Sequence, residues 1–283
     1  MIDASRVITD KPKRYRIAGE ELVVYRASGS VHVAPNTCPH MGAALHLGCV
    51  RDEQIVCAWH GLALGPERHG AWRPFRAHDD GVLVWVQILR SETPTKGPVI
   101  CARPRPATFI DAVMRKEATC EPRDVLQNRL DPWHGVHYHP HSFGSLSVID
   151  QRDDEITVRV NYRIARAFSM EVDARFHCPD RRTIVMTIVD GDGKGSVVET
   201  HATPIAAGQT AIIEATLATS DRPGFQRVLP LSRWLRPVIE RRARRLWIED
   251  AAYAERLYEL RQIRSAESAR DQPDDDLRVN VNA

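Results

Sequence analysis

The sequence predicts an α+β chain in two parts, a small all-β domain followed by an antiparallel sheet with a long helix laid across it. Short strand-type runs separated by turn residues fill residues 12–91, which is typical of a small all-β unit. A single helical stretch over residues 231–264 follows a second group of strand-type runs. This second group covers residues 156–162, 165–173, 183–189, 196–203 and 211–219.

Prolines separate these two parts. Residues 91–106 contain four prolines and a glycine, a composition typical of a semi-extended linker. We therefore expect one domain at residues 12–91 and a second at residues 107–264. The Asp- and Arg-rich composition of residues 265–283 predicts a frayed tail.

Composition and charge are those of a soluble globular protein. The chain has 283 residues, of which 43% are hydrophobic and 27% charged, and its net charge of +2 predicts no strong nucleic-acid partner. Residues 1–16 lack the apolar run of a secretory signal, and no run reaches the ~18 apolar residues of a membrane span. We expect a cytoplasmic protein. Four scattered cysteines are then most simply isolated thiols: Cys49, Cys101, Cys120 and Cys178.

The first domain is expected to hold its chemistry on loops between short strands. Residues 21–26 and 31–33 flank a Ser28-Gly29 turn and predict a hairpin, and residues 54–56 and 81–86 predict further strands. Between them lie a Cys-x-His pair and a Cys-x-x-His pair, sixteen residues apart. These four residues are Cys38, His40, Cys57 and His60.

Two thiolates and two imidazoles at these spacings predict a four-ligand metal site. Zinc is one alternative, but zinc sites usually take both cysteines from one loop and both histidines from another. Here each loop supplies one of each, which suits a two-iron cluster with one iron held by cysteines and the other by histidines. The pattern, including Gly42 and Gly61, resembles the Rieske two-iron two-sulfur (2Fe-2S) domain. Neither loop offers a second cysteine, and Leu62, Ala63 and Leu64 after Gly61 carry no hydroxyl, so a low-potential cluster is expected.

A second motif opens the other domain, after residues 107–130, which look helical near their end. Asp131 and His134 lie one helical turn apart and share a face. His139 would point elsewhere on a regular helix, but Gly135 and Pro140 favour a break that lets both histidines converge. Two histidines and one carboxylate with open positions are typical of non-haem iron(II) oxygenases.

The third ligand is expected on the late helix, which the sequence predicts to be interrupted at Pro237. Asp250 shares a helical face with Trp247, Ala251 and Ala254, so it can point inward, whereas Glu249 is expected to meet solvent. The alternative for Asp250 is an ordinary surface carboxylate.

The run Asn128-x-x-Asp131-x-x-His134-x-x-x-x-His139 is similar to the iron motif of Rieske non-haem iron oxygenase α subunits, over roughly residues 12–262. The resemblance implies a helix-grip catalytic domain and a mononuclear Fe(II) held by His134, His139 and Asp250. It also implies that Asn128 supports the site and that Asp131 bridges to a cluster histidine of a neighbouring subunit in a homotrimer. His137 and His141 compete with the two histidines for the ligand roles.

The resemblance implies a terminal oxygenase that takes electrons from a ferredoxin or reductase and uses O2 to hydroxylate, demethylate or desaturate a small organic substrate. NAD(P)H would act only through a separate reductase, because the chain has no Gly-rich nucleotide loop. The alternative is a Rieske ferredoxin-like electron carrier with a lipid-binding helix-grip domain.

The residues that we expect to line the substrate cavity are mostly apolar, which favours a bulky apolar substrate. No clustered Arg or Lys is expected there. The candidates are Phe168, Met170, Ile184, Met186, Ile188 and Leu217. A basic stretch of the late helix could dock an acidic electron donor or a membrane surface, although a solvated face is the simpler interpretation. It comprises Arg233, Arg236, Arg241, Arg242, Arg244 and Arg245.

Overall fold

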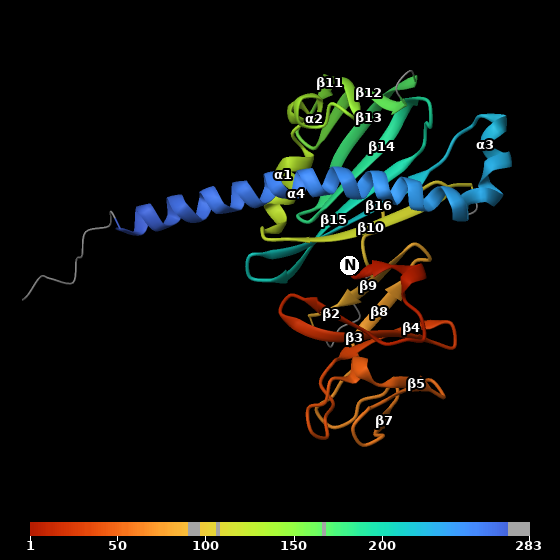
Figure 1. Cartoon of the computed structure of the whole chain (residues 1–283), viewed down its shortest axis with the longest axis vertical. Coiled ribbons are helices and arrows are strands. Elements are labelled where there is room, and N and C mark those ends of the chain that lie inside the picture. Colours follow the sequence, from red (N-terminus) through yellow and green to blue (C-terminus); the bar gives the residue numbers. More distant parts are fainter. Residues whose placement is uncertain (90–96, 106–107, 166–167, 271–283) are drawn as a thin grey trace, which may run out of the picture.

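The computed structural model describes residues 1–89, 97–105, 108–165 and 168–270. Figure 1 shows a β-rich N-terminal domain packed against a second domain, in which one long helix crosses a large sheet. This arrangement confirms the predicted α+β fold. Part of the predicted linker and most of the predicted tail lie outside the described residues.

The N-terminal domain contains three small antiparallel sheets in its described part, in the orders β1-β9-β8, β2-β3-β4 and β5-β6-β7. The strand β1 lies before the predicted start of this domain at residue 12 and pairs with β9. Short 3-10 turns occupy Ser5–Val7 and Leu45–Leu47. The strands are β1 (Asp3–Ala4), β2 (Lys13–Ile17), β3 (Glu20–Ala27), β4 (Ser30–Pro35), β5 (Cys49–Arg51), β6 (Gln54–Val56), β7 (Ala63–Leu64), β8 (Arg76–Asp79) and β9 (Leu83–Gln87).

The second domain is built on a seven-stranded sheet in the order β10-β16-β15-β14-β13-β12-β11, with every pairing antiparallel. The strands are β10 (Ile110–Ala118), β11 (Phe143–Gln151), β12 (Glu155–Ala165), β13 (Phe168–Asp180), β14 (Thr183–Gly191), β15 (Val197–Ala206) and β16 (Gln209–Ala218). The helices are α1 (Pro122–Arg129), α2 (Trp133–Tyr138), α3 (Pro223–Val228) and α4 (Ser232–Arg270), with a 3-10 turn at Leu229–Leu231.

Two of these strands were not predicted. β10 lies at the start of residues 107–130, whose end, predicted to be helical, forms α1, and β11 follows the second motif directly. β10 pairs with β16 along its whole length, and its charged Asp111 is bonded by Arg236 of α4. Strand pairing and these distant partners therefore outweigh the weak local pattern.

The helix α4 buries one face against the sheet. Trp247, Ala251 and Ala254 are at most 1% exposed and pack against Met114 of β10 and Ile212 of β16. The predicted interruption at Pro237 is wrong, because α4 continues through it. Pro237 stands near the start of the helix and removes a single backbone hydrogen bond there. The helix also extends to Arg270, into the stretch predicted to be frayed.

The two domains are joined by a buried ionic cluster and by backbone hydrogen bonds. Arg103 donates two hydrogen bonds to Glu199 of β15, at 2.5 and 2.6 Å, and pairs with Asp80 of the N-terminal domain at 3.0 Å. Ala18 and Gly19 donate backbone bonds to β15, each at 2.8 Å. These contacts hold the β8–β9 turn, through Asp80, and the β2–β3 turn, through Ala18 and Gly19, on the large sheet. No helix in the described residues is long and apolar enough to span a membrane.

Candidate metal centres

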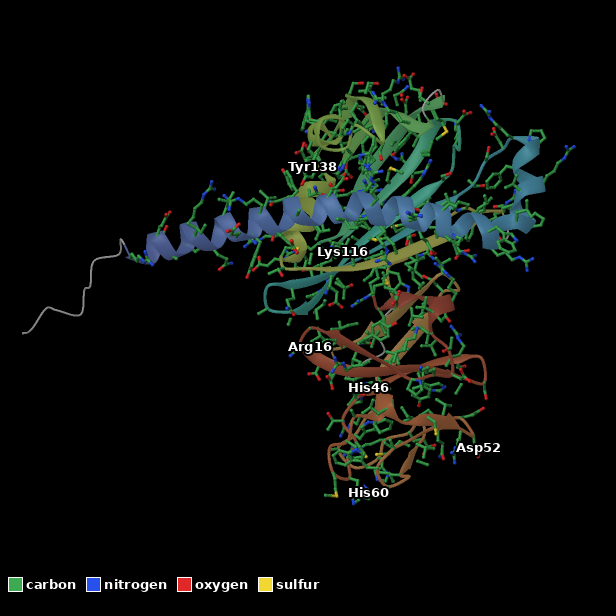
Figure 2. All side chains as sticks on the ribbon, in the orientation of Figure 1. Arg16, His46, Asp52, His60, Lys116 and Tyr138 are labelled. Atoms are coloured by element: carbon green, nitrogen blue, oxygen red, sulfur yellow. The ribbon has the colours of Figure 1, made fainter. Side chains whose placement is uncertain are left out.

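The two predicted cluster loops lie side by side at the outer end of the N-terminal domain. Cys38 and Cys57 are buried, at 2% and 3% exposure, while His40 and His60 are exposed with ring centroids 4.8 Å apart. Figure 2 shows His60 at the tip of this domain, far from Tyr138 of the second domain. The four side chains thus form an inner pair of thiols and an outer pair of imidazoles.

The backbone of each loop turns back on its cysteine. Gly42 donates its N–H to the carbonyl of Cys38 at 2.9 Å, and Gly61 donates to that of Cys57 at 3.0 Å. Both glycines have positive φ, 76° and 70°, which residues with a Cβ rarely adopt. Glycine at these two positions therefore lets each loop close tightly enough to place its ligands.

The two thiols of the pair differ in their pKa shifts. Burial raises the pKa of Cys38. Burial acts the same way on Cys57, but backbone hydrogen bonds from Trp59 and His60, together with Cys38, outweigh it and lower the pKa of Cys57. A thiolate, not a thiol, is the metal ligand. This donor set fits a cluster whose inner iron takes two thiolates and whose outer iron takes two exposed imidazoles.

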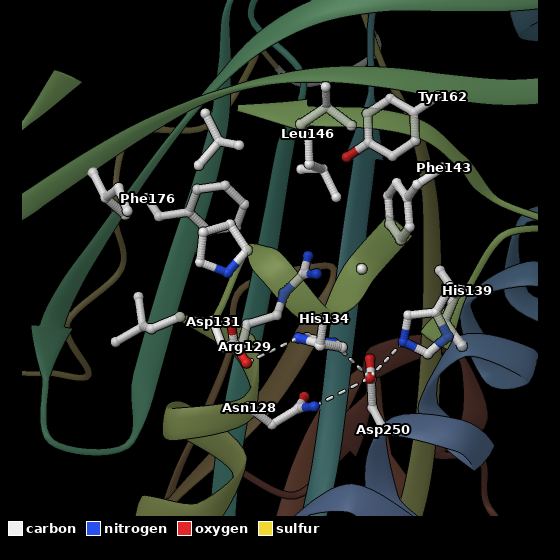
Figure 3. A pocket seen from close by; sticks show the side chains of 17 residues that line it. Asn128, Arg129, Asp131, His134, His139, Phe143, Leu146, Tyr162, Phe176 and Asp250 are labelled. Atoms are coloured by element: carbon white, nitrogen blue, oxygen red, sulfur yellow. Dashed lines mark hydrogen bonds and ion pairs between the residues drawn. The ribbon is translucent and has the colours of Figure 1, made fainter. Parts of the chain in front are cut away.

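The second predicted set converges between the short helix α2 and the middle of the long helix α4. His134 lies on α2, His139 directly follows α2, and Asp250 lies on α4; one ligand atom from each falls within 4.8 Å of the others. Asp250 Oδ1 is 3.2 Å from His134 Nε2 and 2.7 Å from His139 Nε2 (Figure 3). Two imidazoles and one carboxylate on one side of a pocket fit an iron(II) ion with open positions.

The helix α2 ends where the site requires it to end. His139 leaves the helical conformation, with φ −122° and ψ 54°, so its ring turns toward Asp250. Gly135 allows α2 to approach β11, because a Cβ there would lie 2.6 Å from Leu146 Cδ1. The break expected between Gly135 and Pro140 is therefore located at His139.

Hydrogen bonds prepare the site for a cation. Burial alone would raise the pKa of Asp250, but bonds from His134, His139 and Asn128 hold it far below the usual value. Asn128 is fully buried and donates to Asp250 Oδ1 at 3.1 Å. Burial likewise would lower the pKa of His139, but Asp250 and Glu249 raise it above the usual value. A buried carboxylate kept negative beside two imidazoles is a favourable place for a metal ion.

Glu249 does not simply meet solvent, so that part of the prediction is wrong. One of its carboxylate oxygens lies 2.5 Å from His139 Nδ1, and its side chain is 30% exposed. The ring of His139 lies between two successive residues of α4, with Nδ1 facing Glu249 and Nε2 facing Asp250. Of the competing histidines, His137 is exposed, and His141 lies 3.8 Å from Glu249 rather than beside Asp250.

Asp131 lies on the outer side of His134. Its Oδ2 is 3.6 Å from His134 Nδ1, and the hydroxyl of Tyr253 donates to the same oxygen at 3.4 Å. Within the described residues His134 Nδ1 is buried without a hydrogen-bond partner. The Asp131 side chain is 29% exposed, so it can reach both this ring nitrogen and a group outside the domain.

A small pocket and a larger groove adjoin this site. The pocket, of about 50 Å³, is lined by His134, His139 and Asp250, with apolar walls from the sheet. The groove, of about 1500 Å³, also reaches Asp250. Of the predicted cavity residues, Met170, Met186 and Ile188 line the groove.

The other predicted cavity residues do not belong to this groove. Ile184 and Leu217 are buried in the core, at 1% and 0% exposure. The side chain of Phe168 lies outside the described residues. The prediction that no Arg or Lys would cluster at the cavity is wrong, because five arginines line the groove: Arg129, Arg163, Arg222, Arg242 and Arg245.

Comparisons with known proteins agree with this division into two domains. The Rieske 2Fe-2S domain model matches residues 1–88, and a domain of unknown function, DUF5914, matches residues 89–265. The chain is 46% identical over 61 residues to a vanillate O-demethylase oxygenase subunit of Pseudomonas sp. strain HR199, covering 21% of this chain and 17% of that protein. It is 27% identical over 147 residues to the subunit of the same description from Pseudomonas sp. strain ATCC 19151, covering 47% of this chain and 44% of that protein.

Among solved structures, dicamba monooxygenase bound to dicamba has the same fold, with a TM-score of 0.67 at 18% identity. The match covers 94% of this chain and 88% of that one. The alignments to the two demethylase subunits thus span less than half of each of those proteins, whereas the fold match spans almost the whole chain.

Proposed function

Because this chain belongs to the family of Rieske oxygenase terminal (α) subunits, with a second domain of the DUF5914 family, we propose that it is the oxygenase component of a Rieske-type electron-transfer system. It would oxidise a small organic substrate with O2 by hydroxylation, demethylation or desaturation. The convergence of His134, His139 and Asp250 at a pocket carries this proposal.

Each domain would hold one metal centre. Cys38, His40, Cys57 and His60 would hold the 2Fe-2S cluster, and His134, His139 and Asp250 would hold a mononuclear Fe(II). When bound, the two groups supply stored electrons and a centre at which O2 is reduced next to the substrate. The exposed imidazoles at the tip of the N-terminal domain would be the point at which electrons arrive.

The residues around the mononuclear site orient its ligands and exclude water. Asn128 fixes the Asp250 carboxylate through its bond to Oδ1, and Glu249 fixes the ring of His139 through Nδ1. Apolar side chains wall the pocket on the sheet side, among them Leu146, Val158 and Phe176. A dry, shaped pocket keeps the substrate close to the ligands and limits side reactions.

Electron delivery would involve a second copy of the chain. The cluster loops and α2 lie in different domains and far apart in the molecule (Figure 1). Asp131, beside His134 and partly exposed, would accept a hydrogen bond from His134 Nδ1 and meet a cluster histidine of a neighbouring subunit. The family resemblance supports a homotrimer that brings these groups together.

The electrons would come from a separate ferredoxin or reductase, and NAD(P)H would act only through that partner. The two matched demethylase proteins are described as oxygenase subunits, which supports the same division of labour here. The methionines and aliphatic residues of the groove support a bulky apolar substrate.

Reconstitution with a surrogate reductase tests this function. The chain, loaded with both metals, would be supplied with NADH, O2 and a panel of bulky apolar metabolites. We expect oxygenated, demethylated or desaturated product from at least one of them, and none from His134→Ala or Asp250→Ala. A cluster that cycles without product or mononuclear iron would instead support the electron carrier with a lipid-binding domain.

A further inference from the structure

One arginine of the groove beside the metal centre, Arg129, is largely enclosed, with its side chain 20% exposed. Arg129 is the last residue of α1 and directly follows Asn128, which bonds Asp250. It lines both the pocket and the groove. Figure 3 shows its side chain inside the pocket, close to the metal-ligand cluster. This guanidinium therefore lies in the same groove as the ligand Asp250 and adjoins the pocket of the two histidines.

The guanidinium is incompletely paired. Within the described residues Arg129 forms no hydrogen bond, its Nε is buried without a partner, and its ion pair with Glu214 is long, at 3.8 Å. Its charged carbon lies 5.6 Å from the centre of the Phe176 ring. Arg261 is different: it also has a buried Nε without a partner, but its other nitrogens are bonded to Asp124 and Glu121. Nε is enclosed, so an entering acceptor would meet the terminal nitrogens of Arg129, which form no hydrogen bond in the described residues.

The other groove arginines have partners of their own. Arg163 donates to the backbone oxygen of Pro140 at 2.9 Å, Arg222 pairs with Asp192, and Arg242 also has an interaction partner. Arg245 is 65% exposed and has a long ion pair with Glu249. Arg129 is therefore the largely enclosed groove arginine that forms no hydrogen bond in the described structure.

The charge of Arg129 is already balanced. Glu214 is buried, and the indole of Trp247 donates to its Oε2 at 2.7 Å, which fixes the carboxylate beside the guanidinium. An incoming carboxylate would be attracted by Arg129 but repelled by Glu214. An uncharged oxygen can accept hydrogen bonds from the free N–H groups of Arg129 without being repelled by Glu214.

We propose that Arg129 is a specificity-determining residue that binds an uncharged acceptor oxygen, a carbonyl, ether or hydroxyl, on an otherwise apolar substrate. This inference rests on the proposed function, because it assigns the substrate of that same site. It adds that the substrate is bulky and apolar with one polar end, and that this end is held next to the metal ligands.

Equilibrium binding of matched probes tests the inference without electrons, O2 or turnover. The three probes share the naphthalene ring system. Naphthalene itself carries no acceptor group, 2-acetylnaphthalene carries a ketone, and 2-naphthoate carries a carboxylate. Each would be titrated into the purified full-length chain by calorimetry. We expect the ketone to bind about 10- to 100-fold more tightly than naphthalene and more tightly than the carboxylate.

In Arg129→Met the preference for the ketone should fall to about twofold or less, while naphthalene still binds. Arg159→Met, which alters an exposed arginine paired with Asp173 outside the groove, should keep the full preference. If Arg129→Met does not fold, Arg129→Lys replaces it and should lose most of the preference, since an ammonium lacks the planar fork of donors.

The inference is overturned if wild type does not prefer the ketone, if Arg129→Met keeps the preference, if the carboxylate binds best, or if none of the probes binds up to its solubility. A chain that shows the preference but never turns over would support the role of Arg129 and refute the oxygenase function. Turnover without the preference would support the oxygenase function and refute the role of Arg129.

Discussion

The Nδ1 atom of His139 lies 2.5 Å from a carboxylate oxygen of Glu249, while Nε2 of the same ring lies 2.7 Å from Asp250. A carboxylate at Nδ1 keeps the ring proton there and leaves Nε2 as the nitrogen that faces the site. Partners of this kind orient ligand histidines and raise their basicity. Glu249 would therefore act on the proposed iron through the ring of His139.

Replacing Glu249 with alanine is expected to weaken iron binding by about 10- to 100-fold, because the His139 ring loses its orienting hydrogen bond. Anaerobic titration of Fe(II) against a competing chelator measures this affinity directly. Glu249→Gln should lie between wild type and Glu249→Ala, since an amide oxygen still accepts the hydrogen bond but carries no charge.

Glu259→Ala is the matched control on the same helix. Glu259 pairs with Arg256 on an exposed face, at 60% exposure, and should leave iron affinity unchanged. Equal affinities for Glu249→Ala and Glu259→Ala would show that Glu249 has no part in holding the ligand.

Asp250→Ala should lose the mononuclear iron and all turnover while the visible absorption of the cluster stays intact. The expected cause is local, because Asp250 bonds three residues of this site and none of the cluster loops. Iron and acid-labile sulfide content, measured together, check it. Retention of iron and activity would show that Asp250 is not a ligand.

The sequence located residues that the structure brings together because their spacing is local. Two short loops supply the four cluster residues, and one broken helix supplies both histidines. Asp250 is distant in sequence, but its inward direction follows from the apolar residues that share its helical face, such as Trp247 and Ala251.

Features that depend on tertiary neighbours were not predictable in this way. Glu249 and Asp250 point about 100° apart on an ideal helix, so helical periodicity assigns them different surroundings. Only the position of the His139 ring between them brings both into contact. Arg129 likewise reveals its role only once α1 is placed against Phe176 of β13.

The buried pair between Arg103 and Glu199 should make the domain junction sensitive to acid. Burial alone would raise the pKa of Glu199, but bonds from Arg103 and His201 lower it below its usual value of 4.5. The stabilisation is thus complete above this value and is lost as pH falls through the lower, folded-state pKa. The melting temperature of wild type should therefore fall below pH 4.5, and it should fall more steeply with pH than that of a variant without this carboxylate.

Glu199→Gln is that variant. It should be less stable at neutral pH by about 3–5 kcal/mol, because Arg103 is left buried without its main counter-charge, and its melting temperature should change less on acidification. Glu155→Gln, at an exposed pair with Arg175, serves as the control. Parallel acid profiles for wild type and Glu199→Gln would contradict the assignment.

The 2Fe-2S assignment predicts visible absorption and an electron-resonance signal typical of Rieske centres, both lost in Cys57→Ser and His60→Ala. The buried thiol and the exposed imidazole belong to different irons in this scheme, so either change should remove the cluster. Stoichiometric zinc without acid-labile sulfide, after anaerobic reconstitution, would show a zinc site instead.

The last prediction separates electron delivery from iron binding at Asp131. Its Oδ2 lies 3.6 Å from His134 Nδ1, a ring nitrogen that is buried and has no hydrogen-bond partner in the described structure. A small movement closes this gap, and the partly exposed carboxylate can then meet a cluster histidine of another subunit. Asp131→Asn should keep both metals yet strongly slow reoxidation of the reduced cluster when O2 and substrate are present.

Rapid-mixing reoxidation, normalised to bound iron, distinguishes this role from a purely structural one. If Asp131 only orients His134, the Asn variant binds iron more weakly but each bound iron receives electrons at the wild-type rate. If Asp131 is the bridge, the rate per iron falls while iron content is retained. Tyr253→Phe is the matched control, because it removes the 3.4 Å hydrogen bond to Asp131 but keeps the carboxylate. Its rate per iron should stay close to that of wild type, and a loss as large as that of Asp131→Asn would mean that placement of the side chain, and not its charge, controls electron transfer.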